Sequence, residues 1–269
     1  MSESSETALL LLSGIVAGGV NAVAGGGTIL TFAVLSAILP PGPGRLVAAN
    51  VTSKIGLWPG AAAAAWAYRG ARGEQPRWAR WLVVPSVAGG VLGVILLQWL
   101  PKESFDAVVP WLILLAAVLF AVQPQVARLT AARSPQADRP ASAGRVAMTI
   151  LLQLLVGIYG GYFGAGIGIL MLASLGVLGL GDVHALNAVK TLLAAIINGV
   201  ATGMLVVGAA AGGFEIAWWH VAVLAIGSVA GGLAVPPLAR RLPQAVVRRL
   251  VSAIAFGLAG YHFWREWTG

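Results

Sequence analysis

The sequence has no cysteine and few charged residues. The absence of cysteine from its 269 residues excludes disulfides, thiolate catalysis and cysteine-based metal sites. Charged residues make up only 10 %, and hydrophobic residues make up 58 %. A soluble domain uses about 25 % charge to cover its surface. The composition therefore predicts an all-α polytopic membrane protein whose main solvent is lipid.

Acidic residues are scarcer than basic ones, and the formal net charge is +8. A basic balance often indicates nucleic-acid binding, but here the arginines gather in short segments between apolar blocks. That placement is typical of orientation in a bilayer. We therefore predict the lipid bilayer as a partner and no nucleic acid. The first residues, MSESSE, lack the basic region of a cleaved signal peptide, so we expect the first apolar segment to be retained.

Apolar segments long enough to span a bilayer, about 20 residues, lie at residues 47–67, 81–100, 109–126, 186–207, 218–238 and 250–264. Two further apolar blocks, residues 8–39 and 148–179, are about 32 residues long. Each has a glycine cluster near its middle, at Gly25–Gly27 and at Gly164–Gly166. Because glycine disfavours a helix interior, we predict that each block is a re-entrant helical hairpin, broken at the glycines into two short halves. None of the nine acidic residues lies in a predicted span.

The arginines test this topology. Loops 69–80, 127–145 and 239–249 each carry four of them. If residues 148–179 make no net crossing, all three loops share one side, with 12 basic residues against 3 on the other. A single crossing would give 9 against 6. The positive-inside rule favours the hairpin, and it places these loops in the cytoplasm and the C-terminus in the periplasm.

The chain also contains an internal repeat. Residues 24–30 (AGGGTIL) align with residues 164–170 (GAGIGIL), and NVTSK at residues 50–54 aligns with NAVKT at residues 187–191. Residues 1–127 and 146–269 then form two repeats, joined by a cytoplasmic linker at residues 128–145. Each repeat has one hairpin and three spanning helices, so the second copy is inverted relative to the first. Inverted repeats are typical of secondary transporters, whose substrate site lies where broken helices meet near the midplane.

Two of the three lysines, Lys54 and Lys190, lie in the repeated motif. An ammonium group within the membrane and without a carboxylate is costly. Each lysine could extend to the nearest headgroups, or it could compensate the charge of an anionic substrate.

The glycines also allow two interpretations. Gly160, Gly164 and Gly168 have the spacing of close helix packing. A break at both clusters would instead expose backbone N–H groups and helix N-termini that suit an anion. The candidate substrate-binding residues are Asn21, Gly25, Gly26, Gly27, Thr28, Asn50, Ser53, Lys54, Gly164, Gly166, Gly168, Asn187, Lys190, Thr191 and Asn198. Any of the polar ones could equally satisfy a helix carbonyl.

No catalytic or metal motif is present in the sequence. The histidines, His184, His220 and His262, fall at predicted helix ends and are expected to be interfacial. We therefore predict no metal site, no catalytic residues and no cofactor.

Residues 157–208, with the run GIYGGYFGAGIG and the Asn187, Lys190 and Asn198 helix, resemble the second repeat of the sulfite exporter TauE/SafE family. GIVAGGVNAVAGGGTILTFAVL (residues 14–35) resembles the family's first glycine motif. The resemblance implies a carrier in the bacterial inner membrane for small sulfur-containing anions such as sulfite or organosulfonates. The PPGPGR segment at residues 40–45 departs from the second half, which has only GLGDV.

We therefore expect a secondary transporter of a small sulfur-containing anion, acting by alternating access between the inverted repeats, and not an enzyme. An anion channel with the same site, a membrane-embedded enzyme and a membrane scaffold are the alternatives. The enzyme would need acid, base or nucleophile residues in the spans, which are missing. The exact substrate, the coupling ion and the oligomeric state stay open, and a homo-oligomer is among the states allowed.

Overall fold

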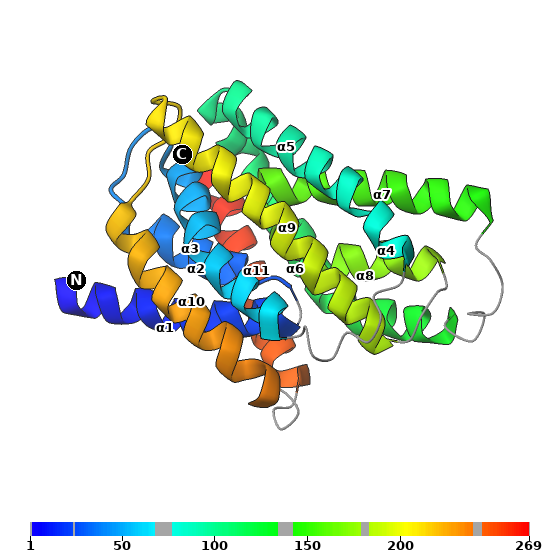
Figure 1. Ribbon diagram of the computed structural model, residues 1–269. Helices are drawn as coiled ribbons and strands as arrows, with labels where there is room; N and C mark the ends of the chain where they lie inside the picture. Colours follow the sequence, from blue (N-terminus) through cyan, green and yellow to red (C-terminus); the bar gives the residue numbers. More distant parts are fainter. Residues whose placement is uncertain are drawn as a thin grey trace.

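The computed structural model describes residues 2–23, 25–67, 77–133, 142–178, 183–238 and 244–268, and the regular structure in them is helical (Figure 1). The helices are α1 (Glu3–Val23), α2 (Thr28–Ile38), α3 (Arg45–Ala67), α4 (Arg77–Trp81), α5 (Val83–Trp99), α6 (Lys102–Arg133), α7 (Ala143–Tyr162), α8 (Ile167–Leu178), α9 (Val183–Ala210), α10 (Trp218–Leu238) and α11 (Gln244–Thr268).

The two long apolar blocks are each divided into a long helix and a short one. The long arms, α1 and α7, have 21 and 20 residues, whereas α2 and α8 have 11 and 12. At 1.5 Å per residue, the long arms extend about 30 Å and the short arms about 17 Å. The expectation of two short halves was therefore wrong for the first arm of each block, because α1 and α7 begin five residues before the predicted apolar blocks, at Glu3 and Ala143.

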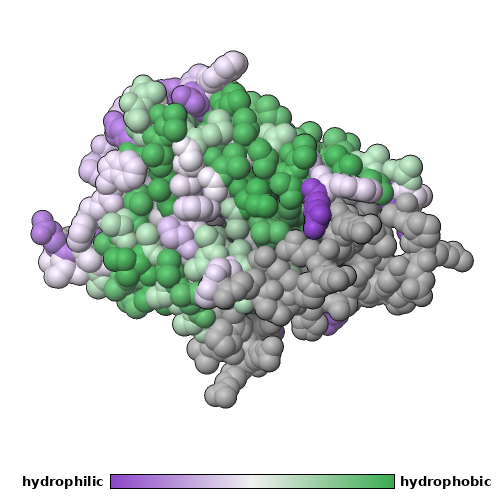
Figure 2. Space-filling model, in the orientation of Figure 1, coloured by the Kyte–Doolittle hydropathy of each residue, from purple (hydrophilic) through white to green (hydrophobic). Residues whose placement is uncertain are grey.

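Five helical segments in the described residues are long and apolar enough to cross a membrane: Glu3–Ala22, Ala79–Trp99, Lys102–Leu129, Ala143–Tyr162 and Leu186–Ala210. The outer surface agrees with a lipid environment, since large apolar side chains are exposed along these helices. Figure 2 shows that apolar residues cover much of one face, with hydrophilic residues towards its edges. The chain is therefore a multi-pass membrane protein. The acidic Glu103 and Asp106 fall within the first turns of α6, because that helix begins seven residues before its predicted span.

Both long arms end in the same backbone turn. The N–H of Gly25 donates to the carbonyl of Val20 at 3.0 Å, and the N–H of Gly164 donates to Tyr159 at 3.0 Å, five residues back in each case. The two glycines have φ values of 76° and 87°, a region that other residues rarely enter. Gly25 and Gly164 therefore occupy equivalent places, one residue away from the alignment of the sequence repeat, which paired Gly164 with residue 24.

In two helix pairs, a helix of one sequence half packs against a helix of the other half. α1 packs along α10, and α7 packs along α5. Glycines allow close backbone contact in both pairs: a Cβ at Gly18 would lie 2.3 Å from the carbonyl oxygen of Ser228, and a Cβ at Gly161 would lie 2.3 Å from that of Gly90. Each long arm is therefore held against a helix from the opposite half of the sequence, by the small-residue packing typical of membrane helices.

The central helices α3 and α9 join these two pairs. α3 lies against α10, where the Ser228 hydroxyl donates to the carbonyl of Gly56 at 2.9 Å. It also contacts α9, where the Trp58 indole N–H donates to the carbonyl of Ala195 at 3.3 Å. α3 therefore lies between α10 and α9, and it carries three of the residues singled out in the sequence, Asn50, Ser53 and Lys54.

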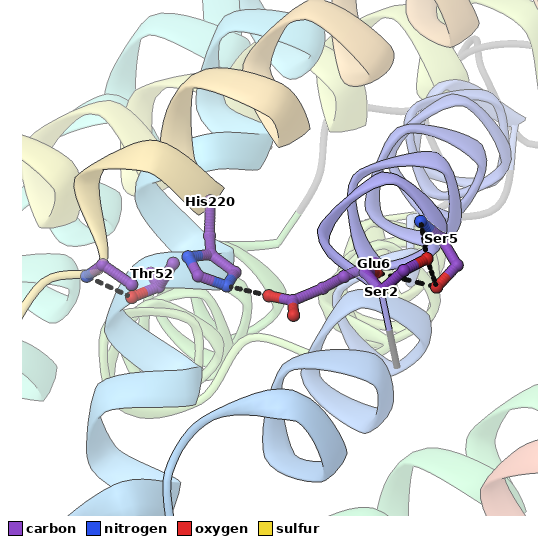
Figure 3. A network of polar contacts seen from close by, with 6 residues as sticks. Ser2, Ser5, Glu6, Thr52 and His220 are labelled. Atoms are coloured by element: carbon purple, nitrogen blue, oxygen red, sulfur yellow. Dashed lines mark hydrogen bonds and ion pairs between the residues drawn. The ribbon is translucent and has the colours of Figure 1, made fainter.

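A polar network closes the outer end of the α1–α10 pair (Figure 3). The Nε2 atom of His220 lies 2.9 Å from a carboxylate oxygen of Glu6, and the backbone N–H of Ala217 donates to the Thr52 hydroxyl at 3.2 Å. His220 begins α10 as the sequence predicts for an interfacial histidine, but it pairs with α1. The side chain of His184 lies outside the described residues.

Candidate functional site

The two glycine breaks meet inside the protein. The N–H of Gly168, in the first turn of α8, donates to the carbonyl of Gly25 at 3.2 Å. A Cβ placed on Gly25 would lie only 2.6 Å from the Cα of Gly168. Segments about 140 residues apart in the sequence are therefore in direct backbone contact, and the short helices α2 and α8 both begin beside this contact.

Lys54 reaches the second break from α3. Its side chain is buried, with 4 % exposed, and its ammonium donates to the carbonyl of Gly160 in the last turn of α7. A Cβ on Gly164 would lie 3.3 Å from the same nitrogen. Within the described residues Lys54 has no carboxylate partner. A buried cation whose counter-charge is only a backbone carbonyl is an anion-attracting group.

Asn50 lies one helical turn before Lys54 and contacts the same turn of α7. It is fully buried, and its amide nitrogen donates to the carbonyl of Tyr162 at 2.9 Å. This bond fixes the orientation of the amide, because a carbonyl accepts only from the nitrogen. The amide oxygen of Asn50 has no hydrogen-bond partner among the described residues.

The first break is capped from within its own half. The side-chain oxygen of Asn21 accepts the N–H of Gly27 at 2.7 Å, so that one donor at the start of α2 is satisfied. The hydroxyl groups of Thr31 and Ser53 are 2.6 Å apart and join α2 to α3. Thr28 is buried at the first position of α2.

Of the other predicted residues, Gly166 directly precedes α8 with a φ of 76°, and four lie on α9, where the hydrogen bonds described for Thr191 and Asn198 stay within the helix. The Thr191 hydroxyl donates to the carbonyl of Asn187 at 2.8 Å, and the Asn198 amide donates to that of Ala194 at 2.8 Å. Lys190 is buried, with 2 % exposed. Lys54 and Lys190 are therefore both buried, on the two central helices α3 and α9.

Aromatic rings surround the meeting point, and sequence reasoning missed them. Phe32 of α2 packs edge-on against Phe163 of the second break, with ring centroids 5.4 Å apart. The hydroxyl of Tyr159 donates to the carbonyl of Ala165 at 2.5 Å. A Cβ on Gly26 would lie 1.8 Å from the ring of Phe120, so α6 crosses the first break closely. Tyr159 and Phe163 were visible in the glycine-rich run, but only the fold brings Phe32 and Phe120 to it.

The arrangement combines one buried cation, two helix N-termini and neutral hydrogen-bonding groups within an apolar shell. No cluster of three metal-ligating side chains occurs in the residues that the structure describes. These groups suit an anion, because ammonium groups and helix N-termini both stabilise negative charge.

Comparison with known proteins identifies the family. The family model described as sulfite exporter TauE/SafE matches residues 10–262. The chain is 29 % identical over 182 residues to a probable membrane transporter protein, ORF9, of a Sinorhizobium species, a match that covers 64 % of this chain and 63 % of the relative. It is 28 % identical over 165 residues to a probable membrane transporter protein of Haemophilus influenzae, covering 61 % and 60 %.

In both cases the match spans about three fifths of the relative's own length. No solved structure matches the chain. The family match covers both glycine breaks and the α3 segment that carries Lys54. The chain therefore belongs to the sulfite exporter TauE/SafE family of membrane transporters.

Proposed function

We propose that this protein is a secondary transporter that exports a small sulfur-containing anion, such as sulfite or an organosulfonate, across the bacterial inner membrane. The observation that carries the proposal is Lys54, a buried cation that has no carboxylate partner among the described residues and lies beside the meeting point of the two helix breaks. The family supports the class of substrate. A monovalent or divalent oxyanion would supply the charge that the site lacks.

The transport site comprises the two breaks and the α3 residues beside them. Asn50, Lys54 and the second break would receive the anion, and the first break, with Asn21 and Thr28, would close the opposite side. The α9 residues Asn187, Lys190, Thr191 and Asn198 stay candidates for the pathway on the side of the second repeat.

The packing supports a form of alternating access in which the moving units are two bundles that each combine helices from both sequence halves. One unit is α1, α3 and α10, and the other is α5, α7 and α9. Within each unit, backbones touch through glycine, as at Gly18 and Gly161. Between the units, α3 meets α9 through the side chain of Trp58. Side-chain contacts change more readily than close backbone contacts, so the site would open along the α3–α9 surface.

The distribution of charge supports an orientation with two inverted repeats. Arg80, Arg128, Arg145 and Arg249 lie at or near the helix ends that flank the segments predicted to be cytoplasmic. Lys102, at the start of α6, marks an end predicted to be periplasmic. The repeats at residues 1–127 and 146–269 would then each contribute one hairpin and three spanning helices.

Transport by purified protein in liposomes tests the proposal. Liposomes would be loaded with sulfite, thiosulfate, sulfoacetate, sulfate or acetate, and efflux would be measured over time. We expect saturable efflux of the sulfur-containing anions and counterflow between them, which a channel does not show. Equal efflux of all five anions would contradict a specific site.

Lys54→Met is the variant that tests the site, and Lys102→Met is its control. Both remove one ammonium group, but Lys102 begins α6 and is exposed. We expect Lys54→Met to lose transport to the level of empty liposomes and Lys102→Met to keep it. Full activity of Lys54→Met would overturn the assignment of Lys54 to the site.

A further inference from the structure

The amide oxygen of Asn50 is a buried acceptor with a fixed direction. Asn50 is fully buried, and its amide nitrogen is held by the carbonyl of Tyr162. Its oxygen therefore points away from that carbonyl, and it has no partner among the described residues. A buried acceptor without a donor costs free energy, so native structures seldom keep one unless a water molecule or a ligand completes it.

The unpaired oxygen lies next to the buried cation. Asn50 and Lys54 are four residues apart on α3, which places their side chains on one face of the helix. Both also bind the last turn of α7, through the carbonyls of Tyr162 and Gly160. One face of α3 therefore presents a positive charge and an unpaired acceptor side by side at the second break.

From this pairing we infer that the site selects anions that also carry a hydrogen-bond donor. The ammonium of Lys54 would compensate the negative charge, and the oxygen of Asn50 would accept a hydrogen bond from an O–H group of the same ion. Hydrogensulfite and hydroxyalkanesulfonates have both features, whereas sulfite dianion and simple alkanesulfonates lack the donor. The inference rests on the proposed function and narrows its substrate class.

Two sulfonates of similar size test the inference. Isethionate (2-hydroxyethanesulfonate) and 1-propanesulfonate have the same charge and differ in one terminal group, O–H or CH3. We expect the wild-type protein to transport isethionate with a KM about tenfold lower, because only isethionate satisfies the buried acceptor. Equal KM values would overturn the inference, and would indicate that a water molecule completes the oxygen of Asn50. Transport of neither anion, nor of sulfite, would overturn the proposed function itself.

Asn50→Leu then assigns the preference to this residue. Leucine has a similar size and no polar atom, so we expect the KM for isethionate to rise and the preference between the two anions to disappear. Thr202→Val is the control, since it removes another buried oxygen without a partner, on α9. It should keep the preference.

The ratio of the two KM values does not depend on how much protein is folded. A purely structural role of Asn50 would affect both anions alike and leave the ratio unchanged, which would contradict the assignment. If Asn50→Leu does not fold, the comparison of the two anions on the wild-type protein still decides the inference.

Discussion

At the break between α1 and α2 a side-chain cap comes from the long arm itself, whereas at the break between α7 and α8 two buried side chains of α3, from the other half, bind the end of the long arm. Asn21 binds the N–H of Gly27. In contrast, Asn50 and Lys54 of α3 bind the carbonyls of Tyr162 and Gly160. The backbone turns are alike, with a glycine at positive φ after each long arm. A repeated backbone can therefore hold two different chemical environments.

This difference indicates which break relies on side chains from the other half of the chain for its polar contacts. The first break is capped by its own Asn21, is crossed by the ring of Phe120, and accepts a backbone hydrogen bond from Gly168 of α8. The second break is bound by α3, so any movement of α3 relative to α7 changes its polar contacts. We therefore expect the second break to change during transport and the first to stay more constant.

Cross-linking gives the largest expected effect and tests whether α3 moves relative to α9. The protein has no cysteine, so introduced pairs react without background. Cysteines at Trp58 and Ala195 would link α3 to α9, between the proposed units. Cysteines at Thr52 and Ala217 would link α3 to the start of α10, within one unit. We expect the first link to stop transport in liposomes and the second to leave it largely intact.

The reverse result would show that the moving units are the sequence halves, as the repeat alone suggested. Equal inhibition by both links would show that α3 does not belong to the α1–α10 unit. Each pair is measured before and after reduction of a cleavable linker, so that the effect of the two substitutions is separated from that of the link.

Alanine at the positive-φ glycines gives the next effect and compares the breaks directly. Each substitution meets a backbone penalty of about 1–2 kcal/mol for a residue at positive φ. Gly25→Ala should cost more than Gly164→Ala, because its Cβ would lie 2.6 Å from the backbone of Gly168. At Gly164 the nearest backbone atom, the carbonyl oxygen of Gly160, would lie 3.0 Å away, and the next neighbour is the flexible end of Lys54. Gly212→Ala is the control, with φ 81° and no neighbour within 4 Å.

The melting temperature in detergent measures this order. We expect Gly212→Ala to lower it least and Gly25→Ala to lower it most. Similar melting temperatures for Gly25→Ala and Gly212→Ala would contradict the close contact between the two breaks.

Much of the secondary structure followed from the sequence because membrane-spanning helices are long apolar segments. The glycine clusters predicted where the two long blocks divide, since glycine at positive φ is a local requirement. The lengths of the arms were predicted less well, because α1 and α7 continue into polar sequence at Glu3 and Ala143, where hydropathy gives no signal.

The tertiary contacts of the site residues were the part of the site that the sequence predicted least well. Lys54 was singled out by its place in an apolar segment, but its acceptor, Gly160, is 106 residues away in the sequence. Lys190 was singled out for the same reason, and it too is buried, on the other central helix. α1 and α7 each pack against a helix of the opposite half, and a single sequence gives no signal for this pairing.

The smallest expected effect concerns the cap of the first break, at Asn21. Asn21→Ala removes the acceptor of the Gly27 N–H and should lower the free energy of unfolding by about 1 kcal/mol. Asn21→Asp keeps an acceptor there and adds a negative charge at the N-terminus of α2, which the helix dipole favours. We therefore expect Asn21→Asp to match the wild type in melting temperature.

In a transport assay we expect the opposite result for these two variants: Asn21→Asp should be impaired and Asn21→Ala should not. Asn21→Ala leaves the charge of the site unchanged, so its KM for sulfite should stay close to that of the wild type. Asn21→Asp places a negative charge near the bound anion. Because like charges repel, we expect the KM of this variant for sulfite to rise about tenfold. An unchanged KM for Asn21→Asp would mean that the anion binds only at the second break, too far from Asn21 to be repelled. The first break would then be a structural cap, and the second break alone would be the binding site.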